Sequence, residues 1–484
     1  MTLDEILKSS DIESKISYLK NRETTLPDAI SLMKDWDPMK HEVMDKEKRP
    51  DGVKIKIEAF DEEVNGKIVP HAATYEADPK NRIALPIEQD QVNIHTAFTV
   101  GTEPKIVCMP NNEKEQELLR ILKSIHTKNK LKYQNKKIVR AWLSECEACE
   151  YWFTVDDNDG FWNKVINKLK KSLGIRAKPK KRLKSTVWSP FNGDKLYPLF
   201  DDKGDLIAMS REYETTNIDN TTTSHFMTVT KDMVYQWDLD KDWEEVAPFR
   251  HNFSKMPIVY IYREHPLCRN IKPLRERLEK LTSDYADCID YNFFPRLVSD
   301  GEVVGRPSKD NGDMIKVENG AKVWYLTWSQ TPEQAKFEFE NLFDQSYSYT
   351  NTPRITFKNL QGTGGAVAGV AFDYVFLSTH LKVDEHNEDI GPFLQRRTNF
   401  LVTAIGDLNK DYTEASETID AICEPVPFRI DDLAQKIDAA AQGVSNGVMS
   451  TKQGVMLVGI ADEVDEELKL IKEDSAIDAL DIAK

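Results

Sequence analysis

The sequence has few cysteines, no long apolar run and no signal-like N-terminus. Its six cysteines, most of them far apart in 484 residues, provide no disulfide framework. No stretch reaches the roughly 20 uninterrupted apolar residues that a membrane-spanning helix needs. Acidic Asp4 and Glu5 stand where a secretory signal carries positive charge. We therefore expect no membrane segment and a protein that is made and kept in a cytoplasm-like compartment.

The residue patterns typical of catalytic and metal sites are also missing. The nine histidines are scattered, and His380 and His386, six residues apart, do not share a helix face. The pair Cys146-x-x-Cys149 lacks a second Cys/His pair to complete a zinc site. We interpret the two cysteines as part of a helix over 139–153. The sequence thus predicts no metal, no cofactor and no catalytic residues.

Positive charge is in deficit, since the formal net charge is −16. Proteins that bind phosphates tightly carry the opposite sign, because counterion release drives their affinity. An acidic wall is nevertheless compatible with a conduit along which a duplex slides without sticking. The apolar content of 40% and charged content of 30% are those of a folded soluble protein, and the length favours two or more folding units.

One segment departs from this balance: 164–184 contains ten Lys/Arg and no acid. The simpler interpretation is a solvated helix face followed by a mobile basic loop around Pro179. The alternative is contact with nucleic acid or with an acidic partner chain.

Hydrophobic periodicity predicts a mixed α+β protein. Helical spacing covers 118–127 and 136–153, and short apolar runs between 187 and 263 predict an antiparallel β region. Further on, a long amphipathic helix is expected over 271–294, with a turn-rich stretch of about thirty residues after it.

The remaining elements follow from start and stop signals. Thr331-Pro332 is expected to begin a second helix. A third is expected from about 366 toward 408, kinked by Gly391-Pro392. Three short helices close the chain, one of them beginning with a capping box at Ser450.

A glycine-rich stretch, 362–369, imitates a phosphate-binding loop. A Walker A loop needs Gly-Lys-Ser/Thr at its end, whereas Val370 follows Gly369 here. A dinucleotide fingerprint needs a third glycine where Val367 stands. A nucleotide-binding enzyme that uses this loop is kept only as an alternative function.

The order of elements from 271 onward resembles the portal proteins of long-tailed double-stranded DNA bacteriophages, the siphophage type of head-to-tail connector. Three strings are similar to that family: Leu281-Thr282-Ser283-Asp284-Tyr285-Ala286-Asp287, then Gly364-Gly365-Ala366-Val367-Ala368-Gly369-Val370-Ala371-Phe372, and Gly443-Val444-Ser445-Asn446-Gly447-Val448-Met449-Ser450 ahead of Asp465-Glu466-Glu467-Leu468. Their order and spacing over about two hundred residues carry the resemblance, which is only general in the N-terminal half.

The resemblance implies a non-enzymatic, structural ring, usually a dodecamer, at the capsid vertex of the virion. The expected regions are an α/β wing (1–265), a stem helix (266–295), a strand-rich clip (296–330), a second stem helix (331–349), a tunnel loop (350–365), a long kinked helix returning to the wing (366–424) and a helical crown (425–484).

The implied function is a channel for packaging and ejecting double-stranded DNA. The implied partners are other copies of the chain, the DNA, the terminase large subunit, a head-completion or tail adaptor protein, and the major capsid and scaffolding proteins, with no membrane and no cofactor. Assembly is expected in the bacterial host cytoplasm. A non-annular phage scaffold protein is the other alternative.

Two groups of site residues follow from this layout. DNA-facing residues are expected in the tunnel loop: Arg354, Lys358, Asn359, Gly362, Gly364 and Gly365. An assembly surface is expected at the clip aromatics Trp324, Tyr325 and Trp328, because aromatic side chains are enriched at interface cores.

Overall fold

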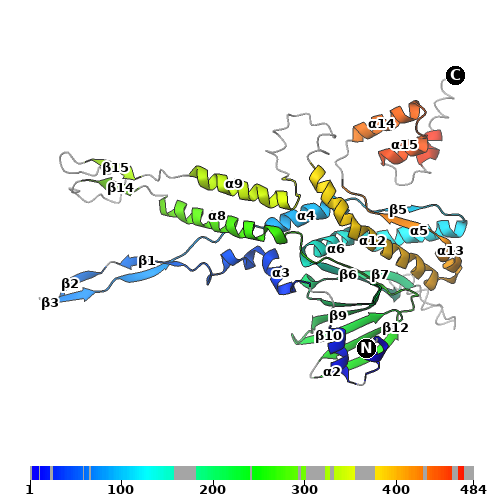
Figure 1. The fold of residues 1–484 in the computed structure, drawn as a ribbon, viewed down its shortest axis with the longest axis horizontal. Coiled ribbons are helices and arrows are strands. Elements are labelled where there is room, and N and C mark those ends of the chain that lie inside the picture. The colour runs from blue at the N-terminus through cyan, green and yellow to red at the C-terminus, as the bar shows by residue number, and fades with distance from the viewer. Residues whose placement is uncertain are drawn as a thin grey trace. The chain divides into compact units, whose positions relative to one another are not determined.

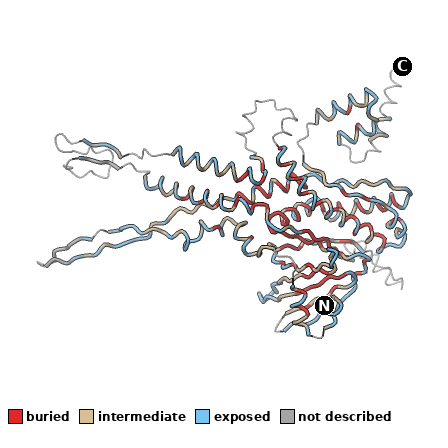
Figure 2. The backbone as a smooth tube through the Cα atoms, in the orientation of Figure 1, coloured by how far each residue is buried: buried red, intermediate tan, exposed pale blue. Residues whose placement is uncertain are grey.

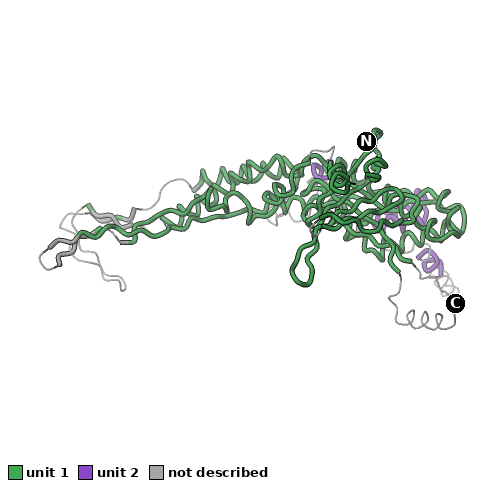
Figure 3. The backbone as a smooth tube through the Cα atoms, turned by 90° about the horizontal axis from the view of Figure 1, so that it is seen from below, with its two compact units in different colours: residues 1–352, 382–427 green, residues 353–381, 428–484 purple. Residues whose placement is uncertain are grey.

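The structure is a computed structural model of the protein. It describes residues 3–9, 11–21, 26–57, 59–64, 67–156, 181–239, 242–292, 296–300, 322–326, 332–354, 376–428, 433–459 and 467–473. The chain divides into two compact units, one of residues 1–352 and 382–427 and one of residues 353–381 and 428–484 (Figure 3).

The strand-rich part of unit 1 contains a five-stranded antiparallel sheet in the order β12-β11-β10-β9-β8. Its strands are β8 (Lys195–Phe200), β9 (Leu206–Thr216), β10 (Thr222–Thr230), β11 (Met233–Leu239) and β12 (Trp243–Arg250). Phe226 and Trp237 of the sheet pack against the N-terminal helices α1 (Leu3–Leu7) and α2 (Ile12–Leu19). The predicted antiparallel region is confirmed.

A second sheet has the order β13-β6-β7, with β6 (Glu147–Asp156) between β7 (Lys181–Trp188) and β13 (Ile258–Tyr262). The prediction of a helix through Phe153 is wrong. Helix α6 (Leu131–Glu145) ends before this strand, and Cys146 turns the chain with a φ of 68°. Cys149 then lies in β6. Because the start of β6 is buried at four successive positions, its side chains lack the alternation that marks a strand.

The main core of unit 1 joins helices that are far apart in the sequence. These helices are α3 (Ala29–Trp36), α4 (Ile87–Val100), α6 (Leu131–Glu145), α8 (Lys272–Asn292) and α12 (Leu377–Leu408, which contains Pro392). Val92, Trp142, Leu278 and Phe393 meet in this core. It therefore holds the first turns of α8 in the body of the unit.

A neighbouring core is built around α5 (Glu113–Lys128) and the part of α12 near Leu401, through Leu118 and Leu122. The two-stranded sheet of β5 (Lys105–Cys108) and β16 (Ala421–Glu424) and helix α13 (Thr413–Thr418) complete it. Short 3-10 turns link the larger elements at Pro38–Lys40, Glu42–Met44, Pro190–Asn192, Arg269–Ile271 and Lys410–Tyr412.

Several elements project from this body of unit 1 (Figure 1). They are α8, helix α9 (Pro332–Tyr349), and the strand pairs β14 (Arg296–Ser299) with β15 (Val323–Leu326), β1 (Gly52–Ile57) with β4 (Thr74–Asp78), and β2 (Phe60–Val64) with β3 (Lys67–His71). Buried residues gather in the body, whereas the far ends of the projecting helices are exposed (Figure 2).

Unit 2 contains helices α14 (Leu433–Ser445) and α15 (Thr451–Val458). The Oγ of Ser450 accepts a hydrogen bond of 3.2 Å from the backbone N–H of Gln453, as the predicted helix start requires. Helices and sheets thus mix in the α+β class that the sequence predicted. In the described part of the chain, no helix combines the length and apolar character needed to cross a membrane.

Candidate functional site: the helix pair α8 and α9

Helices α8 and α9 lie side by side and run in opposite directions (Figure 1). Leu278 of α8 is buried in the main core, and Leu342 and Phe343 of α9 pack against that core. An exposed ion pair links the two helices, with Nη2 of Arg277 2.6 Å from Oε1 of Glu338. At about 1.5 Å of rise per residue, the 21 residues of α8 span roughly 30 Å.

The pair is acidic. Helix α8 carries five acids and four Lys/Arg, and its last twelve residues, 281–292, carry three Asp and no cation. Helix α9 carries four acids and one lysine. The pair therefore presents mainly negative charge, with Asp290 and Glu340 exposed along it and Asp344 exposed nearer the body.

A buried polar cluster anchors the first turns of α8. Arg275 is only 1% exposed, and its Nη1 donates to Oε1 of Glu88 at 2.8 Å and to the backbone carbonyl of Asp35 at 3.0 Å. Glu279, one turn further, accepts from the backbone N–H of Leu85 at 2.8 Å and lies 2.5 Å from Nδ1 of His41. Charged residues of an amphipathic helix are ordinarily exposed, whereas the structure buries both Arg275 and Glu279.

Burial raises the pKa of the Glu88 carboxyl to about 7, although the Arg275 guanidinium opposes that rise. The pKa rises because removing a carboxylate from water costs free energy, and one ion pair offsets only part of that cost. This cluster holds α8 at a fixed place on the body.

Further along α8, the base of the β1–β4 arm is bound to the helix by charged hydrogen bonds. Arg49 donates to Asp284 at 2.7 Å and to Asp287 at 2.6 Å. Asn81 donates from its backbone to Asp287 at 2.8 Å and from its side chain to Asp290 at 2.6 Å. Three aspartates of the acidic stretch are thus fixed by residues about 200 positions away, a contact that local periodicity does not reveal.

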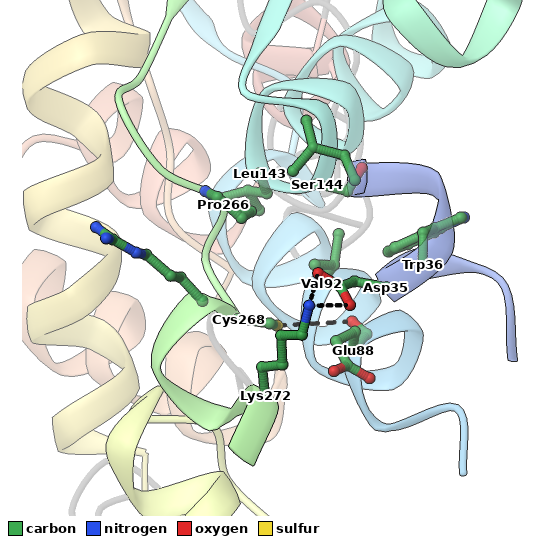
Figure 4. Close-up of a pocket in the computed structure, with 11 residues that line it drawn as sticks. Asp35, Trp36, Glu88, Val92, Leu143, Ser144, Pro266, Cys268 and Lys272 are labelled. Carbon is green, nitrogen blue, oxygen red and sulfur yellow. Dashed lines mark hydrogen bonds and ion pairs between the residues drawn. The ribbon is translucent and has the colours of Figure 1, made fainter. Parts of the chain in front are cut away.

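A small cavity lies beside the start of α8, within the body (Figure 4). Its volume is about 30 Å³, and its wall includes Asp35, Glu88, Cys268 and Lys272. Lys272 Nζ lies 2.9 Å from Oδ1 of Asp35 and spans one side of the cavity. A space of this size holds about one water molecule, so it is a packing defect beside the anchor and not a ligand pocket.

Large apolar side chains are exposed on the projecting part. Phe337 of α9 is 71% exposed, and Ile289 and Tyr291 near the end of α8 are also exposed. Trp324 in β15 is 46% exposed and stands opposite Val298 of β14 in the strand register. An isolated subunit would leave these groups in water, which is typical of a surface that another molecule covers.

The predicted site residues fall partly within the described residues. Trp324 and Tyr325 lie on β15, as part of a strand pair between the two helices. Arg354 is exposed just after α9. Lys358, Asn359, Gly362, Gly364, Gly365 and Trp328 lie outside the described residues, as does the glycine-rich stretch 362–369. Within the ranges the structure covers, no cluster of three or more metal-ligating side chains occurs.

Comparison with protein families decides the identity of the chain. A family model described as "Phage portal protein, SPP1 Gp6-like" matches residues 40–479. The chain belongs to this family of phage portal proteins. The matched span includes the helix pair, the strands between its helices and the polar anchor described above, apart from Asp35.

Members of the phage portal family are structural and not enzymatic, so the alternative of a nucleotide-binding enzyme is set aside. The portal protein is a subunit of an oligomeric ring at the capsid portal of a virion. No curated protein matches the sequence.

Two solved structures show a distant likeness to this portal protein. One chain comes from the "Neck of empty GTA particle computed with C6 symmetry"; it is 11% identical, with 78% of this chain and 90% of that chain covered and a TM-score of 0.40. The other comes from the "Virion of native gene transfer agent (GTA) particle"; it is 12% identical with the same coverage and a TM-score of 0.39.

Proposed function

We propose that α8 and α9 line the channel of the portal ring through which double-stranded DNA is packaged and ejected. The observation that carries this proposal is the acidic, projecting helix pair of a chain that belongs to the portal family. Repeated around a ring, these carboxylates form a wall that repels phosphates, so a duplex slides past without being held. The buried anchor at Arg275 and the bonds from Arg49 keep the helices at a fixed distance from the axis.

The proposal divides the chain into the regions that the family resemblance implies. They are a wing (1–265), stem helices (266–295 and 331–349), a clip (296–330), a tunnel loop (350–365), a long helix returning to the wing (366–424) and a crown (425–484). The exposed Trp324 supports a docking role for the clip, which first binds the terminase large subunit and later a head-completion or tail adaptor protein. We propose twelve subunits and assembly in the host cytoplasm, with scaffolding and major capsid proteins as neighbours.

Site-specific photocrosslinking tests the channel assignment. A photoreactive side chain is placed at Asp290, Glu340 or Asp344, which are exposed on the helix pair, and at Lys203 as a control in the β8–β9 turn. In DNA-filled particles, irradiation is expected to crosslink DNA to the helix positions and not to position 203. Crosslinking at position 203 alone, or no crosslink at any helix position in filled particles, would show that the pair does not face the DNA.

A further inference from the structure

The turn between α5 and α6 has an unusual charge composition for an acidic protein. From Leu118 to Ser144 the chain has no Asp or Glu, although the net charge of the whole protein is −16. The same stretch contains eight cations: Arg120, Lys123, Lys128, Lys130, Lys132, Lys136, Lys137 and Arg140. Such a one-signed stretch is a local reversal of the charge that the rest of the surface carries.

The fold brings a second basic segment against this turn. Nδ2 of Asn129 donates to the backbone carbonyl of Leu183 at 3.2 Å, and Oγ of Ser185 donates to Oε1 of Gln134 at 3.0 Å. These bonds hold the start of β7, which begins at Lys181, beside the α5–α6 turn. Lys181, Arg182 and Lys184 of β7 therefore add three cations beside the turn.

We define the basic patch as the exposed lysines Lys128, Lys130, Lys132, Lys137 and Lys181. Asp156 stands opposite Lys181 in the β6–β7 register. In the part of the chain that the structure describes, none of the five lysines forms an ion pair with a carboxylate. Among the residues with a described placement, carboxylates therefore do not pair with the patch.

Two of these lysines stand at the N-terminus of helix α6, where positive charge is electrostatically unfavourable. Lys130 is the N-cap of α6, provides no side-chain capping bond and has a φ of 54°. Lys132 lies in the first turn of α6, where the sequence has no acid. A helix N-terminus carries partial positive charge and favours anions over cations. The cations therefore oppose the local field, and an anionic ligand would gain from both the lysines and the helix end.

The chemistry of the patch selects the kind of anion. Lysine is depleted at the cores of protein–protein interfaces, and Tyr133 is the large apolar side chain exposed among these lysines. Exposed lysines act as point charges toward phosphates and carry no base-specific hydrogen-bonding pattern. A regularly charged polyanion therefore fits the surface better than a folded acidic protein does.

We propose that the basic patch binds the phosphate backbone of duplex DNA, outside the wall formed by α8 and α9. The patch lies on the body of unit 1, on elements distinct from the projecting helix pair (Figure 1). The contact is independent of sequence and weakens with salt, because it releases counterions. It does not require the channel assignment to hold, since it concerns a different face of the subunit.

The test measures the binding of a labelled random-sequence duplex to assembled wild-type rings by fluorescence anisotropy over a range of salt concentrations. The patch variant reverses Lys130, Lys132, Lys137 and Lys181 to Glu. The matched control reverses Lys8, Lys46, Lys203 and Lys231, which are exposed elsewhere in unit 1, so both variants change net charge equally. Circular dichroism and ring mass establish that each variant folds and assembles.

Wild type and control are expected to bind with similar affinity, and the patch variant at least about tenfold more weakly at low salt. Each lost phosphate contact lowers the slope of log affinity against log salt by about 0.9, so the slope should fall by roughly 3 to 4. If both variants lost the same amount of DNA affinity, the loss would follow from net charge alone and would overturn the proposal. Unchanged DNA binding by the patch variant would also overturn it. If that variant also failed to enter procapsids, the occupant of the patch would be an acidic protein.

Discussion

Replacing Arg275 by Ala tests how α8 is held on the body. The guanidinium is 1% exposed and bonds to Glu88 at 2.8 Å and to the Asp35 carbonyl at 3.0 Å, and its Nε lies 3.9 Å from Glu279. Removing it leaves two buried carboxyl groups without their cation. Loss of one partner of a buried pair costs about 3–5 kcal/mol. Because burial raises the pKa of Glu88 to about 7, this carboxyl takes up a proton readily, which places the expected loss near 3 kcal/mol.

Arg277, two residues further, provides the matched control. Its pair with Glu338 is exposed on both sides, with side-chain exposures of 48% and 40%. Such pairs contribute at most about 1 kcal/mol. Urea unfolding followed by tryptophan fluorescence, at one subunit concentration and pH 7, measures the free energy of unfolding for both variants. Equal losses for Arg275→Ala and Arg277→Ala would refute the anchor, as would a loss below about 1 kcal/mol for Arg275→Ala. The double variant Arg275→Met/Glu88→Gln should recover part of the free energy of unfolding that Arg275→Ala loses, because it also removes the buried carboxylate.

Three further predictions concern pH, assembly and DNA. Burial lowers the pKa of His126 to about 4 in the folded protein, compared with 6.5 in the unfolded chain. The neutral side chain therefore contributes fully to stability above pH 6.5, and this contribution is lost as the pH falls toward 4. This loss is about 3 kcal/mol, and a His126→Phe variant should show a correspondingly flatter stability profile between pH 6.5 and 4 in urea titrations. Trp324→Ala and Phe337→Ser should weaken ring or adaptor association in sedimentation experiments and leave the circular dichroism unchanged; intact association would assign these side chains no role in assembly. Lys358→Glu, alone or with Arg354→Glu, should leave ring assembly intact and reduce DNA packaging in phage particles; normal packaging with both changes would exclude an electrostatic role for the tunnel loop.

Periodicity predicted the long elements well because their buried residues recur at regular spacing. The expected helix over 271–294 is α8, Lys272–Asn292, and the expected start at Thr331-Pro332 matches α9. The antiparallel sheet was also recognised from its short apolar runs and turn residues. These elements are defined by signals within a few residues, which a sequence displays directly.

Elements buried on several sides were missed or misassigned. Helix α4 buries polar Gln91, His95, Thr96 and Thr99 together with its apolar residues, so it has no clear amphipathic stripe. The start of β6 is buried throughout and was assigned to a helix for the same reason. In both cases tertiary burial removes the contrast between faces on which periodicity depends.

The candidate site depended still more on long-range contacts. Arg275 and Glu279 belong to an ordinary charged pattern in the sequence, and only Asp35, Glu88 and His41 make them a buried anchor. The hydrogen bond from Arg49 to Asp284 likewise joins residues that no local sequence pattern connects. The assignments of Lys358 and Trp328 stay predictions from the family resemblance, since both residues lie outside the described ranges.

Electron cryo-microscopy of the purified protein tests directly whether α8 and α9 line a channel. We expect closed rings with a central hole, in which α8 and α9 of each subunit form the wall of that hole and present their acidic residues to it. A monomer under every condition, or a ring that carries α8 and α9 on its outer surface, would contradict it.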